Sequence, residues 1–319
     1  MTTTGSPAAI SATGLRKSYG DHVVLDGIDL GVAEGTVFAL LGPNGAGKTT
    51  MVRILSTLIP ADGGEVRIAG HDISREPDAV RALIGVTGQF SAVDKLFTGD
   101  ENLQLMADLR HLPKAEGRRR VDELLERFDL VEAAGKPVAT YSGGMKRRLD
   151  LAMTLIGDPR IIFLDEPTAG LDPRSRRVMW QTVRDLVAGG VTIFLTTQDL
   201  DEADQLAHRI AVLDRGTFVA EGTADELKRL VSGGRIRLSF TDPDELVRAA
   251  RTFDGASRDS EALTLQIPSD GGVGSLRALL DRLDADSIEV AGLSVETPDL
   301  DDVFLSLTGD TTHEKAPIR

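Results

Sequence analysis

A glycine-rich segment at residues 42–50 most constrains what this chain can fold into. Its sequence, GPNGAGKTT, fits the pattern G-x-x-x-x-G-K-[ST], which is typical of phosphate-binding loops. The apolar run before it, residues 36–41, predicts a buried strand, and residues 50–55 after it predict the first turns of a helix. A strand, a glycine loop and a helix in this order are the context that the pattern requires. A plain glycine turn between strand and helix is the simpler alternative.

The chemistry of this loop rests on its backbone and on two side chains. Glycines let successive N–H groups point inward, and the helix N-terminus adds a partial positive charge. Lys48 would reach the β- and γ-phosphates of a nucleotide, and the Thr49 hydroxyl would bind Mg²⁺. The predicted nucleotide-binding residues of the loop are Gly42, Pro43, Asn44, Gly45, Ala46, Gly47, Lys48, Thr49 and Thr50.

Composition excludes several kinds of site and partner. The chain has 319 residues and no cysteine, which excludes disulfides, thiolate zinc sites and a cysteine nucleophile. Its net charge is −14, and an acidic chain without a basic stripe binds nucleic acid poorly, so we expect no nucleic-acid partner. The sequence contains neither a secretory signal nor an apolar run of membrane-spanning length. We therefore expect a soluble protein that reaches a membrane only through a partner.

Alternating strand and helix patterns predict an α/β fold with a mostly parallel sheet and a small antiparallel subdomain. A helical insertion is expected at about residues 98–155. The expected strands are residues 10–20, 23–32 (one strand or a pair), 36–41, 65–69 at a sheet edge, 82–87, 160–164, 191–196, and a hairpin of 209–213 with 217–220. The expected helices are residues 50–55, 101–109, 118–128, 174–187 and 199–207.

The expected domains are a disordered N-terminus at residues 1–9, a nucleotide-binding domain at 10–232, a small C-terminal α+β domain at 235–309 and a flexible tail at 310–319. A Ser-Gly-Gly linker at 232–234 separates the two domains. The small domain is expected to contain three strand–helix pairs, residues 236–240 with 244–252, 262–267 with 275–283, and 287–296 with 300–307.

Two adjacent carboxylates, Asp165 and Glu166, end the apolar run of residues 161–164. Asp165 at a strand tip could hold Mg²⁺, as a second acidic motif does in phosphate-loop nucleotidases. Glu166 would then polarise an attacking water, as a general base or as a group that orients it. Two solvated acids at a strand end are the simpler alternative.

A second glycine segment, YSGGMKRRL at residues 141–149, precedes a helical pattern. Ser142 is a plausible N-cap, and Gly143 and Gly144 allow backbone N–H groups to approach an anion closely. A second phosphate-type loop about a hundred residues from the first is odd for one nucleotide in one chain. It is explained if this loop faces the nucleotide of another subunit.

The order and spacing of five features resemble those of the ATP-binding cassette (ABC) ATPases over roughly residues 10–230. The features are the two glycine loops, Gln89 after a strand, the Leu-Asp-Glu-Pro strand end and Gly170-Leu171-Asp172. The resemblance implies ATP and Mg²⁺ as cofactors, and a head-to-tail homodimer that sandwiches two ATPs. It implies that Tyr19 stacks on adenine, that Gln89 senses Mg²⁺ and the attacking water, and that Asp172 lies at the subunit junction. The helical insertion would dock on a separately encoded membrane permease at the cytoplasmic face of the membrane.

Three positions depart from the common pattern of that family. Tyr141 replaces a leucine and Met145 a glutamine, but both leave the serine and the glycines in place. Gln198 stands where the family usually has a switch histidine. Glutamine can donate a hydrogen bond to the γ-phosphate but cannot carry a proton near neutral pH. We therefore expect hydrolysis to persist, with Glu166 as the dominant catalytic carboxylate and Gln198 as the other catalytic residue.

Gln198 and the stretch LDDVFL at residues 300–305 resemble the daunorubicin/doxorubicin-resistance branch of ATP-binding subunits. The resemblance implies an ATPase that energises export of a hydrophobic drug, antibiotic or lipid. Leu300, Val303, Phe304 and Leu307 form a helical apolar stripe that packs either within its own domain or on a partner subunit. The alternatives are a soluble ABC ATPase acting on nucleic acid or ribosomes, and a phosphate-loop kinase or GTPase. The chain lacks the basic arms of the former and the Asn-Lys-x-Asp of the latter.

Overall fold

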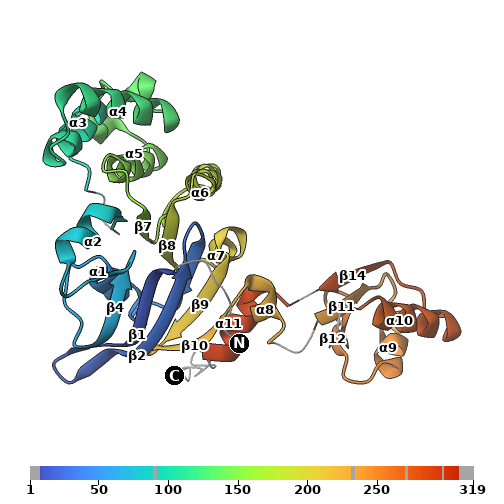
Figure 1. The fold of residues 1–319 in the computed structure, drawn as a ribbon. Coiled ribbons are helices and arrows are strands. Elements are labelled where there is room, and N and C mark those ends of the chain that lie inside the picture. The colour runs from blue at the N-terminus through green and yellow to red at the C-terminus, as the bar shows by residue number, and fades with distance from the viewer. Residues whose placement is uncertain (1–7, 89–91, 231–233, 270–271, 297, 309–319) are drawn as a thin grey trace, which may run out of the picture. The chain divides into compact units, whose positions relative to one another are not determined.

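The computed structural model describes residues 8–88, 92–230, 234–269, 272–296 and 298–308 (Figure 1). The chain divides into two units, residues 1–224 and 225–319, and each is described by itself. This division falls before the linker that we predicted at residues 232–234, because most of helix α8 (Ala224–Lys228) groups with the second unit. Residues 231–233 of that linker lie outside the described residues.

A six-stranded sheet in the order β10-β9-β3-β8-β7-β6 forms the centre of the first unit. All neighbours in it pair parallel except β9 and β10, which form the predicted antiparallel hairpin. The predicted α/β fold with a mostly parallel sheet is therefore confirmed. The strands are β3 (Val37–Leu41), β6 (Ile84–Thr87), β7 (Ile161–Asp165), β8 (Thr192–Thr197), β9 (Arg209–Asp214) and β10 (Thr217–Gly222).

Three phenylalanines tie the middle of this sheet together. Phe38 of β3 and Phe163 of β7 both pair in register with Phe194 of β8. Their ring centroids lie 5.6 Å and 5.7 Å from that of Phe194, and all three side chains are buried. Met51 and Ile54 of helix α1 (Lys48–Leu55) belong to the same core. The apolar face of α1 thereby fixes the glycine loop at the carboxyl end of β3.

A second, antiparallel sheet has the order β2-β1-β4-β5. Its strands are β1 (Ala8–Tyr19), β2 (His22–Ala33), β4 (Gly63–Ile68) and β5 (His71–Asp72). Strand β1 begins at Ala8, so residues 8 and 9 are ordered by pairing with β2 and not disordered as predicted. Strand β4 lies between β1 and the short β5 and is not the edge strand that we expected.

The helical insertion separates β6 and β7, which are neighbours in the sheet. It contains α3 (Gly99–Leu109), α4 (Lys114–Arg127), α5 (Gly143–Leu155) and the 3-10 turns at Val131–Ala133 and Val138–Thr140. Thr98 and Glu101 form a capping box that starts α3. Helices α3 and α4 pack on each other, and α5 contacts both of them and β6 (Figure 1). Helix α5 is thus the link between the insertion and the sheet.

Three further helices complete the first unit, namely α2 (Pro77–Leu83), α6 (Pro173–Ala188) and α7 (Leu200–Leu206). Helix α2 was not predicted, and Ala82 and Leu83 belong to it and not to the strand that we expected from residue 82. The helix is short and buries only Val80, so its apolar residues show little helical periodicity.

The second unit is an antiparallel sheet in the order β12-β13-β11-β14 with helices α9 and α10. Its elements are α8, β11 (Gly234–Ser239), α9 (Pro243–Thr252), β12 (Ser257–Asp259), β13 (Thr264–Ser269), α10 (Val273–Ala285), β14 (Gly292–Glu296) and α11 (Leu300–Thr308). The fully exposed β12 was not predicted. Leu300 and Val303 of α11 are buried.

Candidate nucleotide-binding site

The glycine loop between β3 and α1 has the backbone that the sequence pattern requires. Gly45 and Gly47 have φ values of +84° and +114°, in the region that favours glycine. At Gly42 a Cβ atom would lie 2.4 Å from the carbonyl oxygen of Leu213, so the loop passes too close to β9 for any side chain. Gly47 precedes α1 and supplies no side-chain cap, which leaves the first-turn N–H groups of the helix to a ligand.

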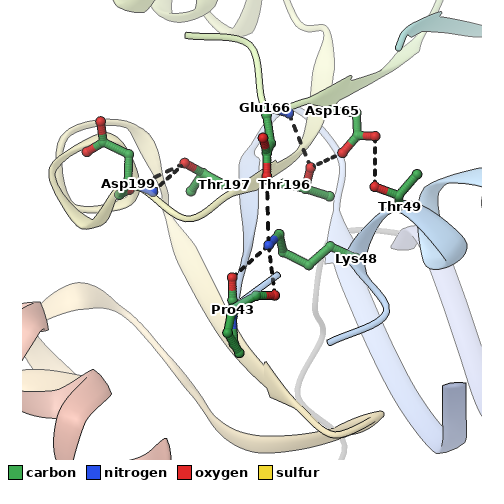
Figure 2. A network of polar contacts seen from close by, with 9 residues as sticks. Pro43, Lys48, Thr49, Asp165, Glu166, Thr196, Thr197 and Asp199 are labelled. Carbon is green, nitrogen blue, oxygen red and sulfur yellow. Dashed lines mark hydrogen bonds and ion pairs between the residues drawn. The ribbon is translucent and has the colours of Figure 1, made fainter. Parts of the chain in front are cut away.

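Lys48 points into the loop and is held there by its own backbone. Its Nζ donates hydrogen bonds to the carbonyl oxygens of Gly42 at 2.6 Å and Pro43 at 3.2 Å. The same Nζ lies 3.9 Å from Oε1 of Glu166 (Figure 2). Burial lowers the pKa of the Lys48 ammonium, and the carboxylates of Glu166 and Asp165 oppose this shift. The same ammonium can donate its hydrogen bonds to phosphate oxygens instead, and hydrogen bonds between two charged groups are stronger than those to neutral carbonyls.

Asp165 and Glu166 lie at the carboxyl end of β7 and point in different directions (Figure 2). The buried Asp165 accepts hydrogen bonds from the hydroxyls of Thr49, at 3.1 Å, and of Thr196. Glu166 has φ +49°, and its N–H donates to the carbonyl oxygen of Thr196 at 3.0 Å. This left-handed turn directs the Glu166 carboxylate toward Lys48.

A hydroxyl and a carboxylate from two elements thus converge beside the loop. Oxygen donors of this kind are the ligands that Mg²⁺ prefers, usually one or two carboxylates together with nucleotide phosphates. Thr49 and Asp165 therefore fit a nucleotide-bound magnesium ion. Among the described residues, no group of three or more His, Cys, Asp or Glu side chains could hold a metal by itself.

Gln198 follows β8 and is exposed. It lines the same cavity as Glu166, a hollow of about 370 Å³ that also contains Thr197, Asp199 and Glu202. Asp199 caps α7 by accepting a hydrogen bond from the N–H of Glu202 at 3.2 Å. The structure therefore brings the switch position and the carboxylate at the end of β7 to one cavity.

Glu202 was missed by the sequence analysis. Its side chain is fully buried, and its Oε1 accepts a hydrogen bond from Nε1 of Trp180 at 3.3 Å. Its Oε2 has no hydrogen-bond partner among the residues that the structure describes. Burial raises the pKa of the Glu202 carboxyl, whereas hydrogen bonds from Thr197, Thr168 and Trp180 oppose the shift and the charge of Asp199 adds to it. An acidic residue in a short helix of otherwise solvated acids gives no sequence signal of burial.

Ser142 caps helix α5, as predicted, by accepting a hydrogen bond from the N–H of Met145 at 3.3 Å. Together with Gly144 and Arg148 it lines a hollow of about 190 Å³. The glycine loop lines a different hollow, of about 190 Å³, with Glu166 in its wall. No residue is common to these two hollows, so within one chain the second glycine segment does not complete the site at the first. Gly143 follows Ser142 and has open space around its Cβ position.

The remaining predicted residues have separate positions. Tyr141 is buried, with its hydroxyl bonded to the carbonyl oxygen of Ala133 at 2.7 Å, and therefore acts as a core residue. Asp172 caps α6 through the N–H groups of residues 174 and 175, and the Ser175 hydroxyl lowers the pKa of its carboxyl. Tyr19 ends β1 with half of its side chain exposed, and the Lys17 ammonium lies 5.5 Å from its ring centre. The predicted Gln89 lies outside the described residues.

Comparison with known proteins identifies the family. A family model described as ABC transporter matches residues 25–169. The daunorubicin resistance ATP-binding protein DrrA3 of Streptomyces coeruleorubidus is 49% identical over 309 residues, 96% of this chain and 98% of that protein. This chain belongs to the ABC transporter ATP-binding proteins. The resemblance inferred from the motifs is thereby confirmed, down to the daunorubicin/doxorubicin-resistance branch.

The chain is also similar to an export protein and to a solved ATP-binding cassette. The Nod factor export ATP-binding protein I of Ralstonia nicotianae is 44% identical over 223 residues, 70% of each chain. A solved dimeric ATP-binding cassette in a post-hydrolysis state, bound to ADP and Pi, matches with a TM-score of 0.61 at 28% identity and covers 67% of this chain and 98% of that one. This ABC protein is an ATPase, the nucleotide-binding subunit of an export system. In the described part of the chain, no helix is long and apolar enough to cross a bilayer.

Proposed function

We propose that two copies of this chain bind two ATP·Mg²⁺ between them and energise efflux of a hydrophobic drug, antibiotic or lipid through a separately encoded permease at the cytoplasmic face of the membrane. The observation that carries the dimer is the separation of the two glycine segments into different hollows of one chain. Each hollow is an incomplete phosphate site, and a head-to-tail pair would join them. A solved relative that is a dimer bound to ADP and Pi supports the proposal of a dimer.

Each side chain at the loop has a proposed task in hydrolysis. Lys48 would exchange its carbonyl partners for the β- and γ-phosphates, and the first-turn N–H groups of α1 would bind the same phosphates. Thr49, Asp165 and Gln89 would hold Mg²⁺, which when bound neutralises charge on the phosphates. Glu166 would accept a proton from the attacking water or orient it. Gln198 would donate a hydrogen bond to the terminal phosphate without carrying charge.

The substrate class follows from the relatives. One is named for daunorubicin resistance and matches nearly the whole chain, including the second unit. Another, named for Nod factor export, matches a shorter part of it. The chain is 49% identical to the daunorubicin-resistance protein but 37–44% identical to the Nod factor export proteins, and this difference favours a drug as cargo. The helical insertion would dock on the permease, with the exposed Leu105 and Leu109 of α3 available for contact.

The direct test is transport by the intact complex. The chain is co-expressed with a candidate permease, sought as a multi-spanning membrane protein among the products of neighbouring genes, and cellular daunorubicin is followed by its fluorescence. We expect lower accumulation with wild type and with the control Arg251→Ala, a change at an exposed arginine in the last turn of α9. Lys48→Ala should restore the accumulation of cells without the transporter. Equal accumulation with wild type and Lys48→Ala, across drugs and lipids, would overturn the export proposal.

A further inference from the structure

Arg147 in the first part of helix α5 sends its side chain to the end of strand β7. Its Nε donates to the carbonyl oxygen of Pro167 at 2.8 Å. Its Nη2 donates to the carbonyl oxygens of Asp165 at 3.1 Å and Glu166 at 3.2 Å. One guanidinium therefore binds three consecutive carbonyl groups of the segment that carries the proposed magnesium ligand and the proposed catalytic carboxylate.

The same guanidinium reaches a fourth carbonyl on another segment. Its Nη1 donates to the carbonyl oxygen of Gly88 at 3.1 Å, directly before Gln89. The same nitrogen lies 3.4 Å from Oδ2 of Asp150, one turn further along α5. Only 13% of the Arg147 side chain is exposed. A planar group with five N–H donors is suited to bind several carbonyls at once, and a lysine is not.

The adjacent arginine, Arg148, binds a different part of the protein, so contact with the end of β7 is particular to Arg147. Arg148 donates from Nη1 to the carbonyl oxygen of Phe128 at 2.8 Å and lies 3.2 Å from Asp129, both within the helical insertion. Within the basic run that follows the second glycine segment, Arg147 therefore links α5 to the sheet, whereas Arg148 links it to the insertion. Burial lowers the pKa of Arg147, and the charges of Asp150, Glu202 and Asp165 oppose this shift.

The hydrogen bonds of Arg147 bear directly on the geometry of Glu166. Glu166 adopts φ +49°, a left-handed conformation that costs energy for any residue other than glycine. Its N–H is held by Thr196 and its carbonyl oxygen by Arg147. The two peptide groups that flank its Cα are therefore both fixed, and the carboxylate is aimed at Lys48.

We propose that Arg147 is a positioning residue that ties the Glu166 turn and the segment entering Gln89 to helix α5, so that movement at the N-terminus of α5 is passed to the catalytic strand end of the same chain. The inference rests on the proposed role of Glu166. In the proposed dimer, the N-terminus of α5 faces the nucleotide bound to the other copy. Arg147 would then make one nucleotide site responsive to the occupancy of the other.

The test compares Arg147→Met and Arg147→Lys with a matched control, Arg120→Met. Arg120 also binds α5 through a carbonyl, that of Leu155 at 3.4 Å, and pairs with Asp158 at 2.7 Å, away from strand β7. We expect Arg147→Met to lower kcat about tenfold or more, because the hydrogen bonds that fix the Glu166 turn are lost. Arg147→Lys should lose less, Arg120→Met should keep its kcat, and the Kd of a fluorescent ATP analogue should stay near wild type in all three.

A double-mutant cycle separates positioning from a general loss of structure. Single-turnover hydrolysis of radiolabelled ATP is measured for Arg147→Met, Glu166→Gln and their combination, or with Arg147→Lys if the methionine variant does not fold. If Arg147 acts through Glu166, the double variant is no slower than Glu166→Gln alone. Three outcomes would overturn the inference. The rate losses of Arg147→Met and Glu166→Gln could multiply in the double variant, nucleotide affinity could weaken as much as kcat falls, or kcat could stay unchanged in both Arg147 variants. Near-wild-type turnover of Glu166→Gln would instead refute the proposed role of Glu166.

Discussion

The ammonium of Lys48 lies 3.9 Å from the carboxylate of Glu166, across the gap between the glycine loop and the end of strand β7. This pair and two loop carbonyls are the polar contacts of the lysine ammonium. A phosphate bound at the loop would draw Lys48 away and leave Glu166 facing the terminal phosphate. The proposed phosphate-binding residue and the proposed water-activating residue therefore lie next to each other at this pair.

Replacing Lys48 by methionine should weaken nucleotide binding about 10–100-fold, since hydrogen bonds from a charged donor are worth about 1.5–3 kcal/mol. The buried stem is kept, and a charge that burial disfavours is removed. The melting temperature without nucleotide should therefore stay equal or rise. Titration with a fluorescent ATP analogue and thermal unfolding check both parts. Unchanged affinity for ATP would contradict the placement of Lys48 at the phosphates.

Glu166→Gln should lower kcat by about 10²–10⁴, the usual contribution of a general base, whereas Gln198→Ala should cost less. Gln198→His should keep hydrolysis and add an inflection near about pH 6.5 to the rate profile, because histidine titrates there and glutamine does not. Steady-state ATPase assays between mildly acidic and mildly alkaline pH test this. If Glu166→Gln turns over like wild type while a change at Gln198 abolishes hydrolysis, the two roles are reversed.

Asp165→Asn should separate nucleotide binding from its dependence on metal. The amide keeps the size of the side chain and can still accept a hydrogen bond from Thr49 or Thr196, but it loses the charge that Mg²⁺ prefers. In EDTA the variant and wild type should bind ATP equally, and wild type should not hydrolyse it. Adding Mg²⁺ should increase affinity and start hydrolysis in wild type only. A variant that responds to Mg²⁺ like wild type would exclude Asp165 as a ligand.

Glu202→Gln should stabilise the fold at neutral and higher pH. Because burial raises the pKa of Glu202, the folded chain keeps a proton that the unfolded chain releases above its ordinary pKa of 4.5. The contribution of Glu202 to the free energy of unfolding is therefore fully present below pH 4.5. It is lost as the pH rises from the unfolded-state pKa to the folded-state pKa. Urea unfolding, followed by the fluorescence of Trp180, should show a flatter pH dependence in the variant.

The control for this experiment is Glu132→Gln, a change at an exposed acid in a 3-10 turn. It should leave the pH dependence of unfolding as it is in wild type. A Glu202→Gln variant with the same slope as wild type would show that the carboxyl is ionised in the folded chain.

Features set by local pattern could be predicted from the sequence, and features set by long-range packing could not. The strand–loop–helix around residues 42–50, the capping serine Ser142 and the β/α alternation all depend on residues close in the chain. The direction of Arg147 does not, because its carbonyl partners lie on segments separated from it by the rest of α5 or by most of the insertion. The burial of Glu202 likewise depends on Trp180 of a different helix.

In the proposed dimer, each ATP site is completed by the other copy. Complementation between two inactive variants tests this arrangement most directly. Lys48→Ala disables the glycine loop. Gly143→Asp disables the second segment without strain, since the nearest atom to a Cβ at Gly143 is 3.9 Å away. Mixed in equal amounts, the two should regain ATPase activity, because a mixed dimer contains one site with both intact parts. A mixture no more active than either variant alone would contradict the shared site.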